Sequence, residues 1–366
     1  MAIDYVEIRD ANRQIIGIVD TAISIIWHSV FFGVGDFEIY AQATPEHLNL
    51  LKEDNYVTRP NKKTIGIIES VRFTRNNQDG DVIIASGRFA KCLLERRFIY
   101  NISGNSNKPT ILSGNVEANA RKLVQDNAIS CTFDSKRNIP VLGLGALQGI
   151  QDTIIDENGV ATQIQVPCVN LLEYTDAFLY EYGLGAQIVF NEDTKKLEYV
   201  IAKGTDRSGS VIFSQEFDNL VQSDYILDTT SERNFALIGG EGDEVQRLYS
   251  SVGTSQGLSR KELFVDGSSI AKKYKDGEVE KTYTDDEYIK LLKSQGRQDL
   301  FAHTLTENFS GTINVTFGNW LLNRDYFLGD LVTIQDNKIN KYAVVRIVEI
   351  TEVQDENGYT IDAKYE

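Results

Sequence analysis

A Gly-x-Ser-x-Gly motif in this chain could do chemistry, because Ser255 lies within Gly253-Thr254-Ser255-Gln256-Gly257. In hydrolases with this motif the serine occupies a sharp turn between a strand and a helix, where its hydroxyl is exposed to a base. Here the preceding residues, Ser250 to Val252, are typical of a polar loop, and no helical pattern follows at once. We therefore interpret Ser255 as a loop residue without a catalytic function.

Two glycine-rich segments match nucleotide-binding loops only in part. Gly143 to Gly149 has Gln148 where the dinucleotide motif needs its third glycine, and no βαβ pattern surrounds it. Ile238 to Glu244 carries acidic side chains that would repel phosphate, and no Gly-Lys-Ser or Gly-Lys-Thr follows it. We expect an apolar turn in the first segment, and a strand that ends in a bulge or tight turn in the second.

The histidines and cysteines are few and scattered, which argues against a local metal site. The six residues are His28, His47, His303, Cys92, Cys131 and Cys168. None stands at metal-ligand spacing from another histidine, cysteine or acid, so we expect structural or surface roles for all six. We predict no metal and no cofactor.

The 53 aspartates and glutamates are numerous enough to include a pair suited to glycoside hydrolysis, but sequence does not show the separation that such chemistry needs. Most of them fall in turns or alternate along strands, where solvation explains them. Asp285 to Glu287 suit a helix N-terminus, whose dipole favours negative charge. We expect no catalytic residue and a protein that is not an enzyme.

The net charge of −16 argues against tight nucleic-acid binding, because that affinity comes from lysine and arginine replacing the counterions of phosphates. The basic doublets Lys62-Lys63, Lys195-Lys196 and Lys272-Lys273 are separated by long acidic stretches and are typical of solvated faces. An acidic surface suits a protein past which DNA moves without sticking.

The chain carries no sign of export or membrane insertion. Met1 to Glu7 contains acids at once and lacks the basic start and apolar stretch of a secretory signal. No apolar run approaches the ~20 residues that span a bilayer. An odd number of widely spaced cysteines favours folding in a reducing cytosol.

Short runs rich in isoleucine, valine, phenylalanine and tyrosine predict consecutive strands in the first hundred residues. The expected strands are Ile3 to Arg9, Ile15 to Asp20, Ile23 to Ser29, Phe37 to Ala41, Tyr56 to Arg59, Thr64 to Thr74 and Val82 to Phe89. Asn76 to Gly80 should form the turn of a hairpin, since Asp-Gly supplies a positive φ. The pattern predicts a barrel or a sandwich.

Helical patterns interrupt the strands twice. Asn115 is placed to cap a helix that carries Val116, Ala120 and Leu123 on one face, and Leu171 to Tyr182 should end at Gly183. Thr284 begins a capping box for a helix to about Gln295, which Gly296 interrupts before a second helix from Asp299 to Glu307. The remaining strand candidates are Ala186 to Phe190, Leu197 to Ala202, Val211 to Phe213, Phe235 to Gly239, Thr312 to Phe317, Leu331 to Gln335, Ala343 to Val353 and Tyr359 to Tyr365.

We therefore predict a mainly β chain with α+β insertions. The first β unit spans residues 1–100 and is followed by an α/β insertion at 101–205. The second β unit comprises residues 206–250 and 308–366, and a helical insertion occupies 251–307. No convincing sequence repeat links the two β units.

Several segments in this order resemble the tail-tip (baseplate) hub proteins of siphophages, which also form the N-terminal structural part of tail-associated lysins. They are Ser24-Ile25-Ile26-Trp27, Gly33-Val34-Gly35-Asp36-Phe37-Glu38, Gly87 to Arg97, Arg233 to Gly242, Arg260 to Asp266 and Leu328-Gly329-Asp330-Leu331-Val332. The glycines among them suit turns or close backbone approach, and Arg88, Arg96, Arg97 and Arg233 suit ion pairs at buried or subunit edges.

The resemblance implies a family related to the hubs of contractile tails and type VI spikes, with two β-barrels per subunit and a homotrimer of six barrels. Such a subunit would be made in the cytoplasm of the bacterial host and would sit at the virion tail tip. There it would join the distal tail ring to a tip or receptor-binding fibre protein. It would also enclose the channel used by the tape-measure protein and genome. Two other functions stay open, namely a peptidoglycan-degrading tail enzyme and a host-receptor-binding tail protein.

Overall fold

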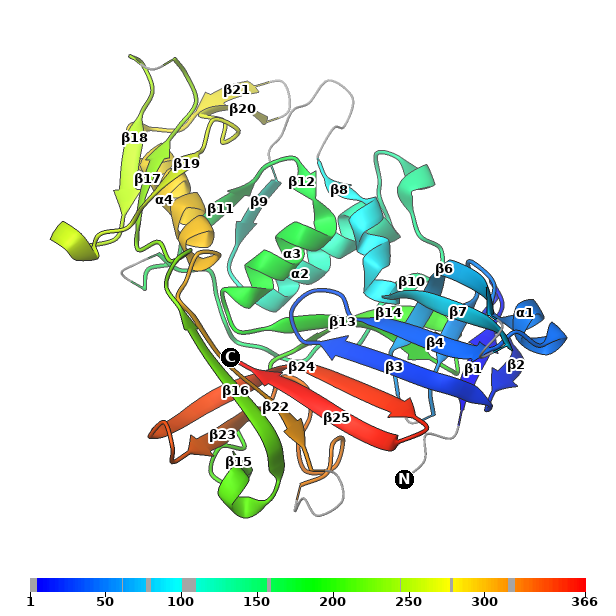
Figure 1. Ribbon diagram of the computed structural model, residues 1–366. Helices are drawn as coiled ribbons and strands as arrows, with labels where there is room; N and C mark the ends of the chain where they lie inside the picture. The colour runs from blue at the N-terminus through cyan, green and yellow to red at the C-terminus, as the bar shows by residue number, and fades with distance from the viewer. Residues whose placement is uncertain are drawn as a thin grey trace.

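The computed structural model describes residues 5–60, 62–76, 80–100, 110–156, 159–243, 245–276, 279–314 and 320–366. The tip of the expected hairpin at 77–79, Glu244 of the second glycine-rich segment and the last part of the expected strand Thr312 to Phe317 lie outside these residues. Figure 1 shows a long sheet crossing the lower half of the molecule, with two smaller α/β units above it.

The first β unit contains seven strands in the described part of the chain. They are β1 (Val6–Arg9), β2 (Ile15–Val19), β3 (Ala22–Val30), β4 (Asp36–Gln42), β5 (Tyr56–Thr58), β6 (Ile65–Asn76) and β7 (Gly80–Phe89). Their order in the sheet is β3-β4-β7-β6-β5-β1-β2. All seven expected strands are confirmed within the described residues, and Ile3 and Asp4 of the first lie outside them. The short helix α1 (Pro45–Leu50), capped by Thr44, was not expected.

The second β unit comes from the last third of the chain. Its strands are β15 (Ile212–Ser214), β16 (Leu220–Asp228), β22 (Thr306–Ile313), β23 (Leu331–Asp336), β24 (Lys341–Asp355) and β25 (Gly358–Tyr365). They follow the order β16-β22-β25-β24-β23-β15. Its core includes Phe213, Phe309 and Tyr365, while Val6, Trp27 and Phe37 belong to the core of the first unit.

Five strands of each β unit have the same topology. In chain order, β3, β4, β5, β6 and β7 correspond to β16, β22, β23, β24 and β25, and the sheet order β3-β4-β7-β6-β5 corresponds to β16-β22-β25-β24-β23. All four ladders within each set are antiparallel. The structure therefore contains an internal repeat that the sequence does not reveal.

Strand β3 joins the two units. One of its edges pairs with β4, and the other pairs antiparallel with β24 from Ile25↔Gln354 to Val30↔Glu349. Mainly β architecture is confirmed, but the pairings among the described residues form one open path and close neither set of strands into a barrel. In the first set, closing a barrel would require the end strands β3 and β2 to pair with each other. Instead, β3 pairs with β24. In Figure 1, β3 and β24 lie side by side where the blue and red halves of the chain meet.

The first insertion lies between β7 and β15. Its elements are η1 (Ala90–Arg96), β8 (Phe98–Ile99), β9 (Thr110–Ser113), α2 (Val116–Val124), η2 (Gln125–Ile129), η3 (Ser135–Arg137), β10 (Leu142–Leu144), β11 (Gln163–Val166), β12 (Val169–Asn170), α3 (Leu171–Tyr180), β13 (Gly185–Asn191) and β14 (Lys196–Ala202). Asn115 caps α2 by accepting from the Ala118 amide, as expected. Gly183, at φ 65°, follows α3.

The second insertion lies between β16 and β22. It contains β17 (Phe235–Gly239), β18 (Tyr249–Val252), η5 (Gly257–Ser259), β19 (Glu262–Asp266), β20 (Lys273–Asp276), β21 (Val279–Thr282) and α4 (Asp285–Phe301), while η4 (Gln215–Phe217) precedes β16. β17 pairs with β18 and β19 and packs against α4, so the expected boundary at residue 250 falls inside β18.

The capping box of Thr284 and Glu287 is confirmed, but the predicted break at Gly296 and the second helix from Asp299 to Glu307 are wrong. α4 continues through Gly296 to Phe301, and β22 begins at Thr306. Gly296 is buried against Ile238 of β17, where a Cβ atom would lie 2.5 Å from the Ile238 Cδ1. The glycine therefore lets the helix approach the strand and does not end it. No helix in the described residues is long and apolar enough to cross a membrane.

We predict that Gly296→Val destabilises the protein by about 1–3 kcal/mol, because the added side chain overpacks a closed contact with Ile238. Urea denaturation measures the loss. Gly209→Ala is the matched control, since a Cβ at Gly209 meets nothing within 4 Å, and its effect should be close to zero. Equal stability of Gly296→Val and the unmodified protein would contradict the packing role.

Candidate functional site

Ser255 does not occupy a nucleophile elbow. It lies in the loop after β18 and is followed by η5, a single short turn of three residues, and then by strand β19. The strand-turn-helix setting that exposes and activates such a serine is therefore missing at this position. The interpretation of Ser250 to Val252 as loop is wrong, because they belong to β18, but no helix follows the turn and the motif match carries no catalytic geometry.

The two glycine-rich segments serve packing. Gly240 lies against the ring of Tyr288, where a Cβ atom would come within 2.7 Å, and Arg247 donates to the Gly239 and Gly240 carbonyls. In the other segment, the buried Glu117 accepts the amides of Gln148 and Ile150, which holds the turn. These backbone groups already have protein partners and form no phosphate cradle.

The cysteines and histidines do not form an activated pair. Burial and the nearby Glu69 carboxylate raise the pKa of the Cys92 thiol to about 11, so the thiol stays protonated near neutral pH. Among the described residues, no group of three or more histidine, cysteine, aspartate or glutamate side chains is arranged to hold a metal ion. The chemistry-bearing residues singled out in the sequence are thus not brought together.

What the fold does bring together is charge, at the contact between β3 and β24. Glu352 of β24 is buried, with 3% of its surface exposed, and its cross-strand partner is the fully buried Trp27. Lys62 pairs with the Glu352 carboxylate, Tyr359 donates to it at 2.6 Å, and Arg59 Nη2 lies 3.8 Å away. Two cations of the first β unit therefore neutralise an acid of the second.

Burial dominates the electrostatics of this cluster. It lowers the pKa of Lys62 and of Arg59, although the Glu352 charge offsets part of each shift. Arg59 also lies over the Trp27 ring at 5.6 Å from its centroid. Because a buried carboxylate without a partner is costly, the two β units hold each other in register through this contact.

The opposite face of the same strands is polar and solvent-exposed. His28 contacts Asp36 at 3.0 Å and Glu349 at 3.3 Å, and Lys364 donates to Glu349 at 2.8 Å. These residues come from β3, β4, β24 and β25, so the contacts run across the boundary between the β units. With the exposed acids Glu38 and Asp362, they form one continuous face, which we call the polar face.

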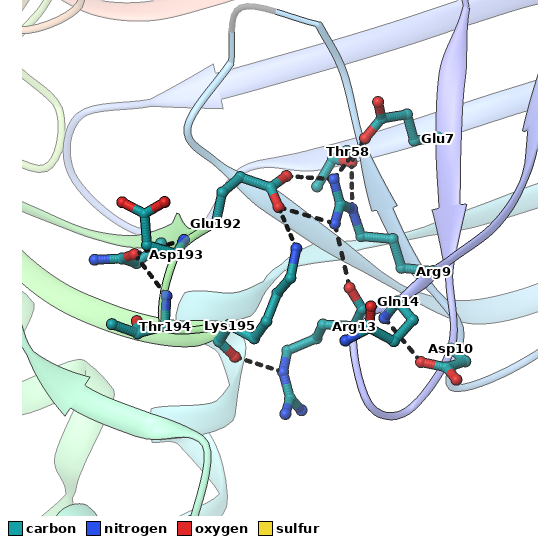
Figure 2. Close-up of polar contacts among 11 residues, drawn as sticks. Glu7, Arg9, Asp10, Arg13, Gln14, Thr58, Glu192, Asp193, Thr194 and Lys195 are labelled. Carbon is teal, nitrogen blue, oxygen red and sulfur yellow. Dashed lines mark hydrogen bonds and ion pairs between the residues drawn. The ribbon is translucent and has the colours of Figure 1, made fainter.

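The first insertion is fixed to the first β unit by a second charge cluster. Figure 2 shows the Arg9 guanidinium pointing toward Glu7, Thr58 and Glu192, and the Arg13 side chain pointing toward the Lys195 carbonyl. Arg9 is 1% exposed and lies 4.8 Å from the centroid of the Phe190 ring. Glu192 and Lys195 belong to the turn between β13 and β14, so this turn is locked onto β1.

A third buried pair ties the insertion to the turn that follows β3. Lys91 of η1 contacts Asp176 of α3 at 2.6 Å and donates to the Gly33 carbonyl at 2.8 Å. Burial lowers the pKa of Lys91 and raises that of Asp176, and each charge offsets part of the shift in the other. The three clusters together orient rigid units relative to one another, which is a structural task.

Sequence reasoning located some of these residues and missed others. Arg88 forms the expected ion pairs, with Glu69 at 2.8 Å and Glu95 at 2.6 Å, whereas Arg97 and Arg233 donate to backbone carbonyls. Glu352 and Arg9 were not singled out, and the interpretation of Lys62 as part of a solvated face is wrong, because its side chain is 15% exposed and pairs with the buried Glu352. The same strand also carries Arg346, Glu349 and Thr351, so its sequence does not distinguish Glu352 from an exposed strand acid.

One family model matches nearly the whole chain. The family model described as "Siphovirus ReqiPepy6 Gp37-like protein" matches residues 5–364. A search of curated protein sequences finds no significant match.

Solved structures share the fold at low sequence identity. The tail protein from Neisseria meningitidis MC58 has a TM-score of 0.58 at 14% identity, over 99% of this chain and 95% of that one. The 43 kDa tail protein of prophage MuSo2 from Shewanella oneidensis has a TM-score of 0.56 at 12% identity, over 99% and 98%. Prophage tail protein gp18 from Listeria monocytogenes EGD-e has a TM-score of 0.51 at 11% identity, over 98% and 94%.

We predict that Lys62→Met destabilises the protein by about 3 kcal/mol, because it leaves the buried Glu352 carboxylate with a weaker partner. The double variant Lys62→Met/Glu352→Gln should cost less than the sum of the two single changes. Lys63→Met, at the exposed neighbouring lysine, is the control. Chemical denaturation of the four variants gives the coupling, and strictly additive losses would contradict it.

The polar face should respond to acid through Glu349. Burial acts to raise the pKa of this carboxyl, but Lys364 and His28 outweigh it and lower the pKa. Such a group stabilises the folded state above its unfolded pKa of about 4.3, and the contribution is lost as pH falls through the lower folded value.

We therefore expect Glu349→Gln to reduce the free energy of unfolding by about 0.5–1 kcal/mol at neutral pH, with a difference that shrinks below about pH 4. Denaturation from neutral to acid pH measures this. Glu38→Gln, an exposed acid of the same face, should change stability little. A difference that stays constant in acid would rule out the lowered pKa.

Proposed function

This chain belongs to the siphovirus ReqiPepy6 Gp37-like protein family, and from that membership we propose that it is a hub subunit at the tip of a siphophage tail. It serves as a structural protein of the virion tail. Three copies form a ring that joins the distal end of the tail tube to a tip or fibre protein. The ring surrounds the channel through which the tape-measure protein and then the genome leave.

The internal repeat is the observation that carries this proposal. Each chain presents two β units whose five common strands share order and direction, and β3 and β24 join them edge to edge. Three such chains supply six similar β units, which is the number of barrels that the family resemblance implies for a hub ring. A ring of this kind suits the transition between a sixfold tube and a threefold tip.

The polar face supports the channel. Asp36, Glu38 and Asp362 are exposed on it, opposite the two hydrophobic cores, and the contact between His28 and Glu349 crosses the boundary between the units. Turned toward the lumen, these acids would repel phosphates and let DNA pass without binding. The net charge of −16 per chain has the same effect.

A structural role fits the state of the reactive residues. Ser255 lies in a loop that a three-residue turn follows, the Cys92 thiol is held protonated, and the buried ions Glu352 and Arg9 are engaged with protein partners. None of these groups is arranged to attack a glycan or a peptide bond. We therefore propose assembly, and not peptidoglycan cleavage, as the function.

We predict that the purified protein, alone or mixed with its distal tail protein, is a trimer. Light scattering coupled to size exclusion measures the mass directly. A monomer under both conditions would overturn the proposal. The same sample should release no soluble fragments from peptidoglycan and should not bind host cell walls by itself.

A further inference from the structure

The internal repeat can be followed residue by residue through the strand registers. Phe37↔Gly87 and Ala41↔Ile83 in the β4–β7 ladder correspond to Phe309↔Tyr365 and Ile313↔Ile361 in the β22–β25 ladder, with the same spacing between the pairs. Ring contacts agree, because Trp27 packs on Phe37 at 5.8 Å and Tyr225 packs on Phe309 at 4.8 Å.

Irregularities in the ladders fall at corresponding places. The β3–β4 register shifts between Ala22 and Ser24, and the β16–β22 register shifts between Leu220 and Gln222. The β6–β7 register shifts between Ile68 and Ser70, and the β24–β25 register shifts between Ile347 and Glu349. Bulges are specific features of a fold, so these shifts fix the alignment of the two units.

This alignment shows that the contact joining the units has two unused equivalents. Ile25–Val30 of β3 corresponds to 223–228 of β16, and 349–354 of β24 corresponds to 70–75 of β6. In the part of the chain that the structure describes, β16 pairs only with β22, and residues 70–75 of β6 pair only with β7. Each chain thus carries one free copy of each side of its own junction.

Both free edges expose apolar side chains, and on β6 their equivalents are buried in the chain's own junction. Val71 and Phe73 of β6 are 41% and 48% exposed, whereas the corresponding Ile350 and Glu352 of β24 are 2% and 3% exposed. On β16, Leu227 is 54% exposed and Ile226 is 50% exposed. Long edge strands with apolar side chains bind other strands unless they are protected, so these edges need a partner.

The two edges are complementary to each other. Applying the register of β3 and β24 to them places Tyr225 opposite Phe73 and Leu227 opposite Val71 on the core side. On the other side Arg72 lies opposite Ile226, with Asp224 and Asp228 diagonal to it. Aromatic, apolar and opposite-charge pairs at these positions stabilise antiparallel ladders.

We infer that Ser70–Arg75 of β6 in one copy of this chain pairs antiparallel with Ser223–Asp228 of β16 in the next copy, in the register of the β3–β24 junction. The partner is a second copy because the two free edges are the missing halves of a contact that the chain already makes within itself. Different surfaces meet head to tail, which is the arrangement that builds rings. The inference rests on the proposed trimer and assigns its interface.

Cysteine cross-linking tests the strand register. Val71→Cys/Leu227→Cys, in a Cys168→Ser background that removes the one exposed native thiol, should oxidise to covalent dimers and trimers. Val71→Cys/Ile226→Cys is the matched control, because a shift of one residue turns the side chain to the opposite face. We expect about tenfold more cross-linked chain in the first variant than in the second.

A second variant tests the interface without a cross-link. Phe73→Glu places a carboxylate opposite Tyr225 and should raise the dissociation constant of the trimer at least about tenfold. Leu258→Glu, at a fully exposed leucine of η5, should leave the trimer intact. Thermal unfolding of both variants confirms that the monomer still folds.

The outcomes separate the two proposals. A trimer that neither cross-links above the control nor weakens with Phe73→Glu overturns this interface and leaves the hub intact. A protein that stays monomeric alone and with its distal tail protein overturns the hub and this interface together. Cross-linking within a single chain, seen as an unchanged mass, also overturns the interface.

Discussion

The pairing of β3 with β24 is the constraint on which the rest of the structure depends. It joins the second strand hairpin of the chain to its penultimate strand and turns two sheets into one. Backbone hydrogen bonds alone would allow the strands to slip. The buried Glu352, which needs Lys62, Arg59 and Tyr359 around it, penalises any other register because a slipped carboxylate would lose its partners.

The insertions depend on this sheet for their orientation. Arg9 binds the turn between β13 and β14, and Lys91 binds both α3 and the turn after β3, so the first insertion is held on one side of the sheet. In the second insertion, α4 packs on β17 through Gly296. These contacts cross the boundaries between separate hydrophobic cores, so they hold the insertions against the sheet.

The sequence predicted elements whose causes are local. Short runs rich in isoleucine, valine, phenylalanine and tyrosine identified the strands of the first β unit. Asn115 and Thr284 identified helix starts, because capping depends on neighbouring residues. It failed at Gly296, where the decisive contact with Ile238 is distant in the chain. The sequence also did not reveal the repeat, because structurally equivalent residues differ in identity. Trp27 corresponds to Tyr225, and Ala41 corresponds to Ile313.

The charge clusters were beyond sequence reasoning for the same reason. Glu352 resembles many other strand acids until Lys62 and Arg59 are placed beside it by the fold. The Gly-x-Ser-x-Gly match around Ser255 shows that a local motif can occur without its function. The motif is catalytic only on a strand-turn-helix segment, which this loop lacks.

The distance along the chain between β3 and β24 has a consequence for biosynthesis. His28 and Glu349, which meet at the junction, are 321 residues apart. During translation the first β unit leaves the ribosome long before β24 exists, and its β3 edge stays open through that interval. Nascent chains on one polysome could therefore pair this edge with the β24 of another chain. The time needed to translate the last hairpin then sets how long each chain is exposed to such mispairing.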